Sequence, residues 1–379
     1  MRTSLREIAF VFLKLGSIAF GGPAAHIAMM EDEVVRRRRW LSHEEFLDYL
    51  GATNLIPGPN STELAIHIGQ ARAGWPGLLF AGSCFILPAA LIVIAIAWAY
   101  VRFGALPAMS GILYGVKPVV IAVVFQALWG LGRAALKTRG LIALAVVAIV
   151  AAGIGVNELV ILFAAGGVLI VARKAIDARP GGLTPAAAFV AGSTSAQIGA
   201  TALAAPFGLL PLFGVFLKIG SVLFGSGYVL LAFLRSDLVE RLHWLTERQL
   251  LDAVAVGQVT PGPVFTTATF VGYVLGGAWG AVVATIGIFL PAFVFVAMSG
   301  ALLPRVRRSM AARAALDGVN VASLALMAVV SAQLARAAIV DWTTVALAAA
   351  AALLLFRWKT NSAWLVTAGA LVGTLTRTL

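Results

Sequence analysis

Long uninterrupted apolar stretches constrain this chain more than any other feature. They occupy residues 76–101, 108–136 and 279–302, and each exceeds the roughly 20 residues that a helix needs to cross a bilayer. Across the chain, 61% of residues are hydrophobic and 12% are charged, whereas about 25% of the residues in a soluble domain are charged. The sequence therefore predicts an all-α polytopic membrane protein.

Charge, cysteine content and missing motifs exclude several classes of function. The net charge of +12 includes the run Arg36–Arg39, which is most simply a cytoplasmic loop because Lys and Arg collect there. No nucleic-acid-binding motif accompanies it, so nucleic acid is excluded as a partner. Cys84 is the single cysteine, which excludes disulfides and cysteine-based metal sites. No HExxH, Gly-x-Ser-x-Gly or P-loop motif occurs, so we expect no enzyme, no cofactor and no metal.

The chain is an internal repeat. FLKLGSIAFGG at 12–22 aligns with FLKIGSVLFGS at 216–226 at an offset of 204, and NLIPGPNST at 54–62 aligns with QVTPGPVFT at 258–266. After a one-residue deletion, Gly74 and Pro88 match Gly277 and Pro291. We therefore expect two homologous halves, residues 1–180 and 205–379, joined by a linker at 181–204.

Each half is expected to hold about five transmembrane helices and one re-entrant helical hairpin. The hairpins are predicted at 42–73 and 246–276. The spans are predicted near 6–28, 76–101, 108–136, 138–153 and 157–173, and near 206–234, 279–302, 312–338, 341–356 and 361–376.

An odd number of crossings would place the halves in opposite orientations, as inverted repeats. Seventeen Lys and Arg would then lie on one side and eight on the other, with three inside spans, which accounts for all 28. The positive-inside rule puts both termini outside. If residues 184–204 cross instead, the halves become parallel.

A Pro-Gly-Pro break interrupts each hairpin. Proline cannot continue a helix, and in hydrocarbon the freed backbone groups must be buried in protein or line a cavity. Paired interruptions at matching positions indicate a transporter binding site. A helix that begins there presents unpaired N–H groups and a partial positive charge of about half a unit, which suits an anion.

The candidate substrate-binding residues flank these breaks or lie in the first predicted span of each half. Hydroxyl and amide groups would donate to a small oxyanion, although Ser or Thr at a helix start is more often only a cap. A lysine at depth marks function, yet it can also snorkel to the interface. The set is Lys14, Asn54, Pro57, Gly58, Pro59, Asn60, Ser61, Thr62, Lys218, Gln258, Pro261, Gly262, Pro263, Thr266 and Thr267.

A second set is assigned a structural or gating role: Gly21, Gly22, Pro23, His26, Gly225 and Gly227. Glycine permits a turn or a close backbone approach, and the alternative is helix packing through small residues. His26 has Leu230 as its counterpart, which favours an interfacial hydrogen bond over a proton relay. Glu63 and His67 are four residues apart and could form a proton-coupled pair.

Several motifs resemble the chromate ion transporter family. They are FGGPAAH, RRRWL, LIPGP and FILPA in half one, and FLKIGSVLFGSG, WLTERQLLDAVAVGQVTPGPVFTTATFVGY and GIFLPAF in half two. The resemblance covers nearly the whole chain and is to the long, two-domain type. It implies a multi-pass carrier of the bacterial inner membrane that exports chromate, confers chromate resistance and has oppositely oriented halves. Glu63 departs from the family pattern, since members often carry an amide there.

We therefore expect a secondary chromate transporter that works by alternating access. The alternative is a transporter or channel for sulfate or another oxyanion, because sulfate has the same shape and charge as chromate. The expected partners are the oxyanion and the lipid bilayer, and a homodimer is left open.

Overall fold

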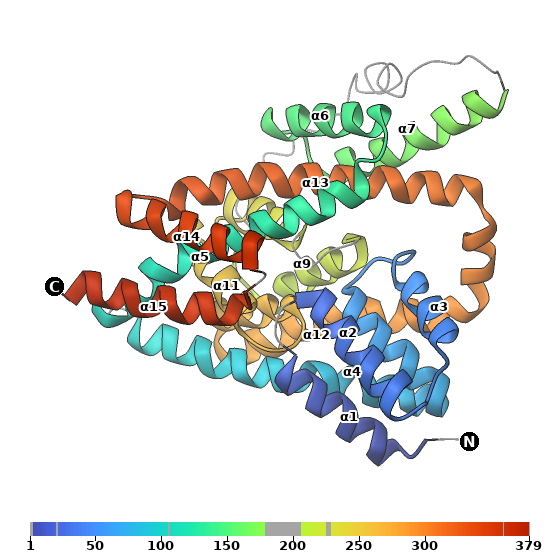
Figure 1. Ribbon diagram of the computed structural model, residues 1–379, viewed down its shortest axis with the longest axis horizontal. Helices are drawn as coiled ribbons and strands as arrows, with labels where there is room; N and C mark the ends of the chain where they lie inside the picture. Colours follow the sequence, from blue (N-terminus) through green and yellow to red (C-terminus); the bar gives the residue numbers. More distant parts are fainter. Residues whose placement is uncertain are drawn as a thin grey trace.

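A computed structural model describes residues 3–19, 22–104, 107–178, 206–224, 229–358 and 360–378. All regular structure in these ranges is helical (Figure 1). Half one comprises α1 (Leu5–Ile18), α2 (Gly22–Glu31), η1 (Asp32–Arg37), α3 (His43–Thr53), α4 (Asn60–Phe103), α5 (Pro107–Ala135), α6 (Arg139–Gly153) and α7 (Glu158–Ala178). Half two comprises α9 (Leu209–Val222), α10 (Leu230–Leu234), η3 (Arg235–Arg241), α11 (Glu247–Val259), η4 (Val264–Thr266), α12 (Thr267–Arg308), α13 (Met310–Ala338), α14 (Trp342–Trp358) and α15 (Ser362–Thr378).

The repeat extends to local backbone geometry. A π-helical turn, η1 or η3, occurs at the same point of each half. A residue with positive φ follows each turn, Arg39 at 52° and His243 at 54°. The next helix of each half, α3 or α11, then begins with a capping box, which satisfies orphan N–H groups at its start. The run Arg36–Arg39, expected as a loop, begins inside η1.

Two helix breaks lie where the sequence predicts them. α3 ends at Thr53 and α4 begins at Asn60, with Pro57-Gly58-Pro59 between them. α4 then kinks at Gly74 and α12 kinks at Gly277, with φ of 65° and 62°, a backbone region that glycine adopts without penalty. These kinks separate the short first arms of α4 and α12 from the long apolar parts that follow.

The predicted spans 6–28 and 206–234 are wrong as single crossings. α1 ends at Ile18 and α2 begins at Gly22, whose φ is 76°. Arg38, after η1, donates to the Glu7 carboxylate at 2.7 Å, and Arg72 of α4 donates to the Thr3 hydroxyl at 2.8 Å. The chain therefore enters along α1, turns at glycine and returns to the same end along α2.

Half two repeats this first hairpin. α9 ends at Val222 and the next described helix, α10, begins at Leu230. The ring of Phe207, ahead of α9, lies 5.4 Å from the ring of Trp244, which follows η3. Both ends of this segment therefore meet as well. Because the first helix pair of each half doubles back, the expected odd number of crossings no longer follows.

The later helices match their predicted positions closely. Within the described ranges, four helices are long and apolar enough to cross a membrane: α4, the Gly111–Ala135 part of α5, Val264–Ser299 and α13. The shorter apolar helices include α6, α14 and α15. α7 is not among these helices, but it is 21 residues long and covers nearly all of the predicted span 157–173. With α7 included, each half has four helices after its two hairpins.

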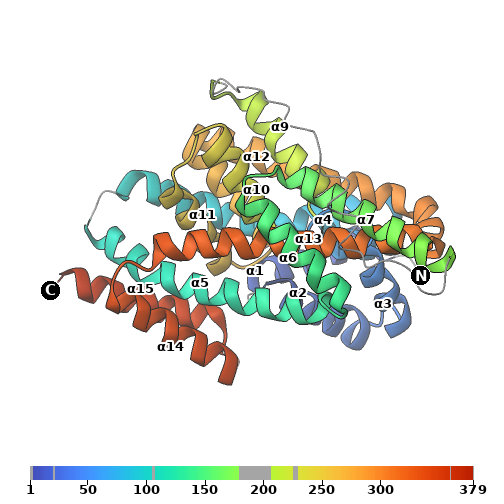
Figure 2. The same ribbon diagram turned by 90° about the horizontal axis from the view of Figure 1, so that it is seen from above.

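The halves interlock through their last helices. α6 and α7 pack against α13 of half two, and α14 and α15 pack against α5 of half one (Figures 1 and 2). A Cβ at Gly318 of α13 would meet Gly166 of α7, and a Cβ at Gly115 of α5 would meet Gly369 of α15. Small residues permit such close helix crossings in membranes. Gly115 and Gly318 differ by 203 residues, and so do Gly166 and Gly369. The two crossings are therefore equivalent, and each half packs its last helices against the other half.

Candidate functional site

The first Pro-Gly-Pro turn is anchored by the other half of the chain. Gly58 has a φ of 141°, and its N–H donates to the carbonyl of Leu223 at 2.7 Å. Leu223 caps the C-terminus of α9 in an extended conformation, so its carbonyl has left the helical ladder and is free to accept. A Cβ at Gly58 would lie 3.6 Å from Cβ of Ala292 in α12.

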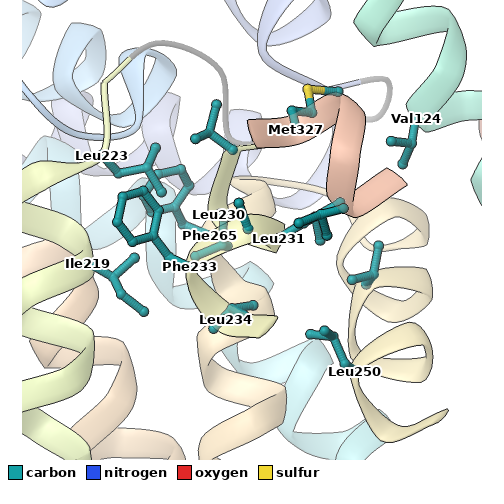
Figure 3. Packing of buried hydrophobic residues seen from close by; sticks show 14 of the residues in the cluster. Val124, Ile219, Leu223, Leu230, Leu231, Phe233, Leu234, Leu250, Phe265 and Met327 are labelled. Carbon is teal, nitrogen blue, oxygen red and sulfur yellow. The ribbon is translucent and has the colours of Figure 1, made fainter. Parts of the chain in front are cut away.

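The second turn makes the equivalent contact with the first half of the chain. Gly262, with a φ of 84°, donates its N–H to the carbonyl of Ala19 at 2.9 Å. Ala19 caps the C-terminus of α1, and a Cβ at Gly262 would lie 2.6 Å from Cβ of Ala89 in α4. The neighbouring Phe265 belongs to the same buried cluster as Leu223 and Phe233 (Figure 3).

These contacts obey the internal repeat. Gly58 and Gly262 differ by 204 residues, and so do Ala19 and Leu223. Reciprocal contacts of this kind are typical of a two-fold relationship. Each Pro-Gly-Pro turn thus meets the broken first helix of the opposite half beside α4 and α12. The arrangement satisfies, inside the protein, backbone groups that lipid would leave unpaired.

The polar residues of the first turn are partly engaged and partly exposed. Asn60 Nδ2 donates to Asn54 Oδ1 at 2.9 Å, and Asn54 itself is exposed. Ser61 Oγ lies 3.3 Å from His26 Nδ1. The buried Thr62 hydroxyl has no hydrogen-bond partner among the described residues. Pro57 is half-buried, so this turn is open on the Asn54 side.

The second turn is more enclosed. Pro261, Gly262 and Pro263 are all buried. The Thr266 hydroxyl donates to the Pro263 carbonyl and the Thr267 hydroxyl to the Val264 carbonyl, each at 2.8 Å. Both threonine hydroxyls therefore donate back to carbonyls three residues earlier in this conformation, and they would have to leave these carbonyls to bind an anion. Gln258, the counterpart of Asn54, is half-buried at the end of α11.

Glu63 distinguishes the two turns. Its side chain is fully buried, and neither carboxyl oxygen has a hydrogen-bond partner among the described residues. Oε1 lies against Gly58, where it would block any Cβ at that position. Thr266 and Thr267, which are neutral, stand at the corresponding place in half two. The first turn therefore carries an acid that the second turn lacks.

Lys14 and Lys218 are held by acids. Lys14 Nζ lies 3.2 Å from Glu33, and Lys218 Nζ lies 2.6 Å from Asp237. The side chains of Glu33 and Asp237 are 8% and 2% exposed. Arg38 also pairs with Glu33 at 2.8 Å. Each lysine thus belongs to an ion-pair cluster of the first hairpin, and an oxyanion would compete with that acid.

His26 links the first hairpin to the first turn. Its Nε2 lies 3.0 Å from the Ala19 carbonyl, and a carbonyl only accepts, so Nε2 carries the proton. Nδ1 is then free to accept from the Ser61 hydroxyl. Ala19 therefore receives both His26 and Gly262. Gly22 and Pro23 begin α2, whereas Gly21, Gly225 and Gly227 lie outside the described residues.

A cavity that includes several charged side chains in its lining lies at a place that the sequence analysis did not select. Its volume is about 600 Å³. Lys117 of α5 pairs with Asp252 of α11 at 2.8 Å, and their side chains are 12% and 1% exposed. Tyr100 donates to the same carboxylate at 2.9 Å, and Arg248 also lines the cavity. Lys117 is a charge inside an apolar run, which is a signal of function in membrane proteins.

The fold and site define a polytopic membrane protein of two interlocked repeats, with broken helices meeting between them. Repeats with interrupted helices at matching positions are found in membrane transporters. The chain belongs to the chromate transporter family, whose sequence profile matches residues 6–171 and 210–374.

Individual relatives are also named as chromate transport proteins. The chromate transport protein of Cupriavidus metallidurans is 34% identical over 373 residues, covering 97% of this chain and 92% of the relative. That of Pseudomonas aeruginosa is 35% identical, covering 86% and 80%. A probable chromate transport protein of Synechococcus elongatus is 30% identical, covering 90% and 87%. No solved structure matches the chain.

Proposed function

We propose that this protein is a secondary transporter that exports chromate across the bacterial inner membrane and so confers chromate resistance. The reciprocal anchoring of Gly58 and Gly262 carries the proposal, because it brings interrupted helices from both halves to one region between α4 and α12. The names of the relatives supply the substrate. The substrate-binding residues are those flanking the two turns, together with Lys14 and Lys218. Each lysine would leave its carboxylate partner, Glu33 or Asp237, to bind the oxyanion.

The two hairpins differ in a way that supports alternating access. α11 is held against α5 by the Lys117–Asp252 pair, whereas Asp48, the counterpart of Asp252, is exposed on α3. If the halves exchange these two conformations, the open side of the site changes with them. The structure would then be one of two related states, open beside the first turn.

We propose that the halves are inverted repeats with the N-terminus in the cytoplasm. The far end of α4, at Tyr100, meets the beginning of α11, at Asp252, as expected for oppositely oriented halves. The contact of Arg38 with Glu7 brings the N-terminus to the arginine-rich side, so Arg6 adds to the positive-inside bias. This replaces the expectation that both termini lie outside. With four crossings in each half, the end of α7 and the beginning of α9 would lie on opposite sides.

Purified protein in liposomes tests the function. We expect unlabelled chromate inside the vesicles to drive saturable uptake of radiolabelled chromate, and we expect this counterflow to be lost when both Gly58 and Gly262 are replaced by valine. In cells, expression should lower chromate accumulation and raise resistance. Absence of counterflow from correctly folded protein would contradict the proposal.

A transporter or channel for sulfate or another oxyanion is the alternative function. Competition separates the substrates: sulfate that inhibits chromate counterflow and is itself exchanged faster would make sulfate the preferred substrate. Flux that does not saturate and shows no counterflow would indicate a channel. A homodimer is also proposed, and the mass of the protein in detergent tests it.

A further inference from the structure

Chromate binding alone does not explain why the buried acid Glu63 lies at this site. This residue lies in the first turn of α4, is 0% exposed, and directs Oε1 at Gly58 of the Pro-Gly-Pro turn. Neither carboxyl oxygen has a hydrogen-bond partner within the described ranges. The site therefore contains an acceptor group that faces the turn and is not satisfied by the protein.

Burial determines the protonation state of this carboxyl group. An ionised carboxylate without a partner is strongly disfavoured in an apolar surrounding, and such groups take a proton instead. The α12 residues that pack near the turn, Ala292, Phe293 and Val296, are apolar. Glu63 is accordingly neutral in this conformation, and an ionised Glu63 would repel a dianion at the adjacent helix start.

Several ionisable groups on the surrounding elements make contacts other than with Glu63. His67, one turn along α4, stacks on Tyr49 of α3 at 5.6 Å. His26 of α2 lies against Ser61 and Ala19. The other titratable groups on these elements include Arg6, Glu7 and Lys14 of α1, Glu31 of α2, His43, Glu44, Glu45 and Asp48 of α3, Glu247, Arg248 and Asp252 of α11 and Tyr273 of α12. Lys14 pairs with Glu33, and Asp252 pairs with Lys117.

Half two has no equivalent acid. Thr266 and Thr267 occupy that place, and their hydroxyls are satisfied within their own turn. The first turn thus carries a carboxyl group that the second turn lacks, so one molecule offers one carboxyl proton position at the proposed oxyanion site.

We propose that Glu63 is a proton-binding site and that one proton crosses the membrane on its carboxyl group together with each oxyanion. This rests on the proposed transport function and specifies its coupling. The proton is taken from water on the loading side and is released to water on the other side. The dianion and one proton together carry a single net negative charge.

Thermodynamic linkage between proton binding and oxyanion binding gives this proposal a second consequence. If the proton and the oxyanion favour each other's binding, each raises the affinity for the other by the same factor. Chromate affinity of the native protein should therefore fall as pH rises through the titration of Glu63. Glu63→Gln, which is neutral at every pH, should show a flat profile.

The charge carried per chromate is the decisive measurement. It is obtained in liposomes from the electrical current and the flux of radiolabelled chromate, at alkaline pH where chromate is present as the dianion. The native protein should carry one net charge per chromate, and Glu63→Gln should carry two, a two-fold rise. Glu63→Asp should retain a ratio of one. Glu44→Gln, the same change at an exposed carboxyl on α3, should also retain it.

Three results would overturn the proposal. One is an unchanged ratio in Glu63→Gln. Another is a native ratio of two. A third is accumulation driven by a sodium gradient and not by a pH gradient. Native protein that shows no chromate counterflow would instead contradict the transport function.

Infrared spectroscopy of the purified protein decides the protonation of Glu63 without transport. A protonated-carboxyl band present in native protein and absent from Glu63→Gln is expected. Its absence from native protein would contradict the proposal even if Glu63→Gln proved unable to transport.

Discussion

Replacing Lys117 by methionine should destabilise the protein strongly, because it leaves a buried carboxylate without its cation. Asp252 is 1% exposed and would keep only the hydrogen bond from Tyr100. Removing one partner of a buried ion pair costs about 3–5 kcal/mol. Asp252→Asn should cost less, because Lys117, at 12% exposure, can extend its ammonium group into the adjoining cavity.

The double variant provides the sharper test of this ion pair. With both charges removed, the buried carboxylate no longer needs a cation, and such replacements are often close to neutral. We expect Lys117→Met with Asp252→Asn to recover most of the loss, with a coupling free energy of about 2–3 kcal/mol.

Equilibrium unfolding in mixed micelles, followed by tryptophan fluorescence, measures the free energy of each variant. Glu44→Gln, at an exposed carboxyl of α3 in half one, is the control and should change stability by no more than about 0.5 kcal/mol. Strictly additive effects of the two substitutions would refute the ion pair. So would a Lys117→Met variant as stable as native protein.

Three further predictions concern the hairpins and the topology. Gly74→Ala should cost about 1–2 kcal/mol, because its φ is positive while the space around it is open; Gly69→Ala should cost more, since its Cβ would meet the backbone of Gly77, and thermal unfolding in detergent ranks the two. Thr246→Ala should cost about 1 kcal/mol by removing the cap of α11, measured in the same way, and no loss would refute the capping role. In a Cys84→Ser background, cysteines at Ser4 and Ser309 should react with an impermeant reagent only from the cytoplasmic side.

The sequence predicted those elements that depend on local chemistry or on the duplication. The Pro-Gly-Pro breaks follow from proline's missing donor, and the capping box at Ser42 follows from its Glu45 partner. The positions of α5, α6, α13 and α14 follow from long apolar runs bounded by polar residues. These signals lie within short windows, so no knowledge of packing was needed to find them.

The reversal of the first helix was missed because its cause is tertiary. Residues 6–28 are apolar enough to read as one span, and glycine there is compatible with both a turn and close helix packing. What distinguishes the two is the ion pair between Arg38 and Glu7, groups 31 residues apart. Likewise, Asp252 becomes recognisable as part of a site only when Lys117, 135 residues away in the sequence, is placed beside it.

The central claim is that each Pro-Gly-Pro turn is anchored by the broken first helix of the opposite half. An electron cryo-microscopy map of the protein in lipid nanodiscs, at a resolution that places main-chain atoms, tests it directly. We predict Gly58 N within hydrogen-bond distance of the Leu223 carbonyl and Gly262 N within the same reach of Ala19, as in the 2.7 Å and 2.9 Å contacts here. Turns packed only against their own half, or lying in bulk solvent at the rim of the protein, would contradict the account.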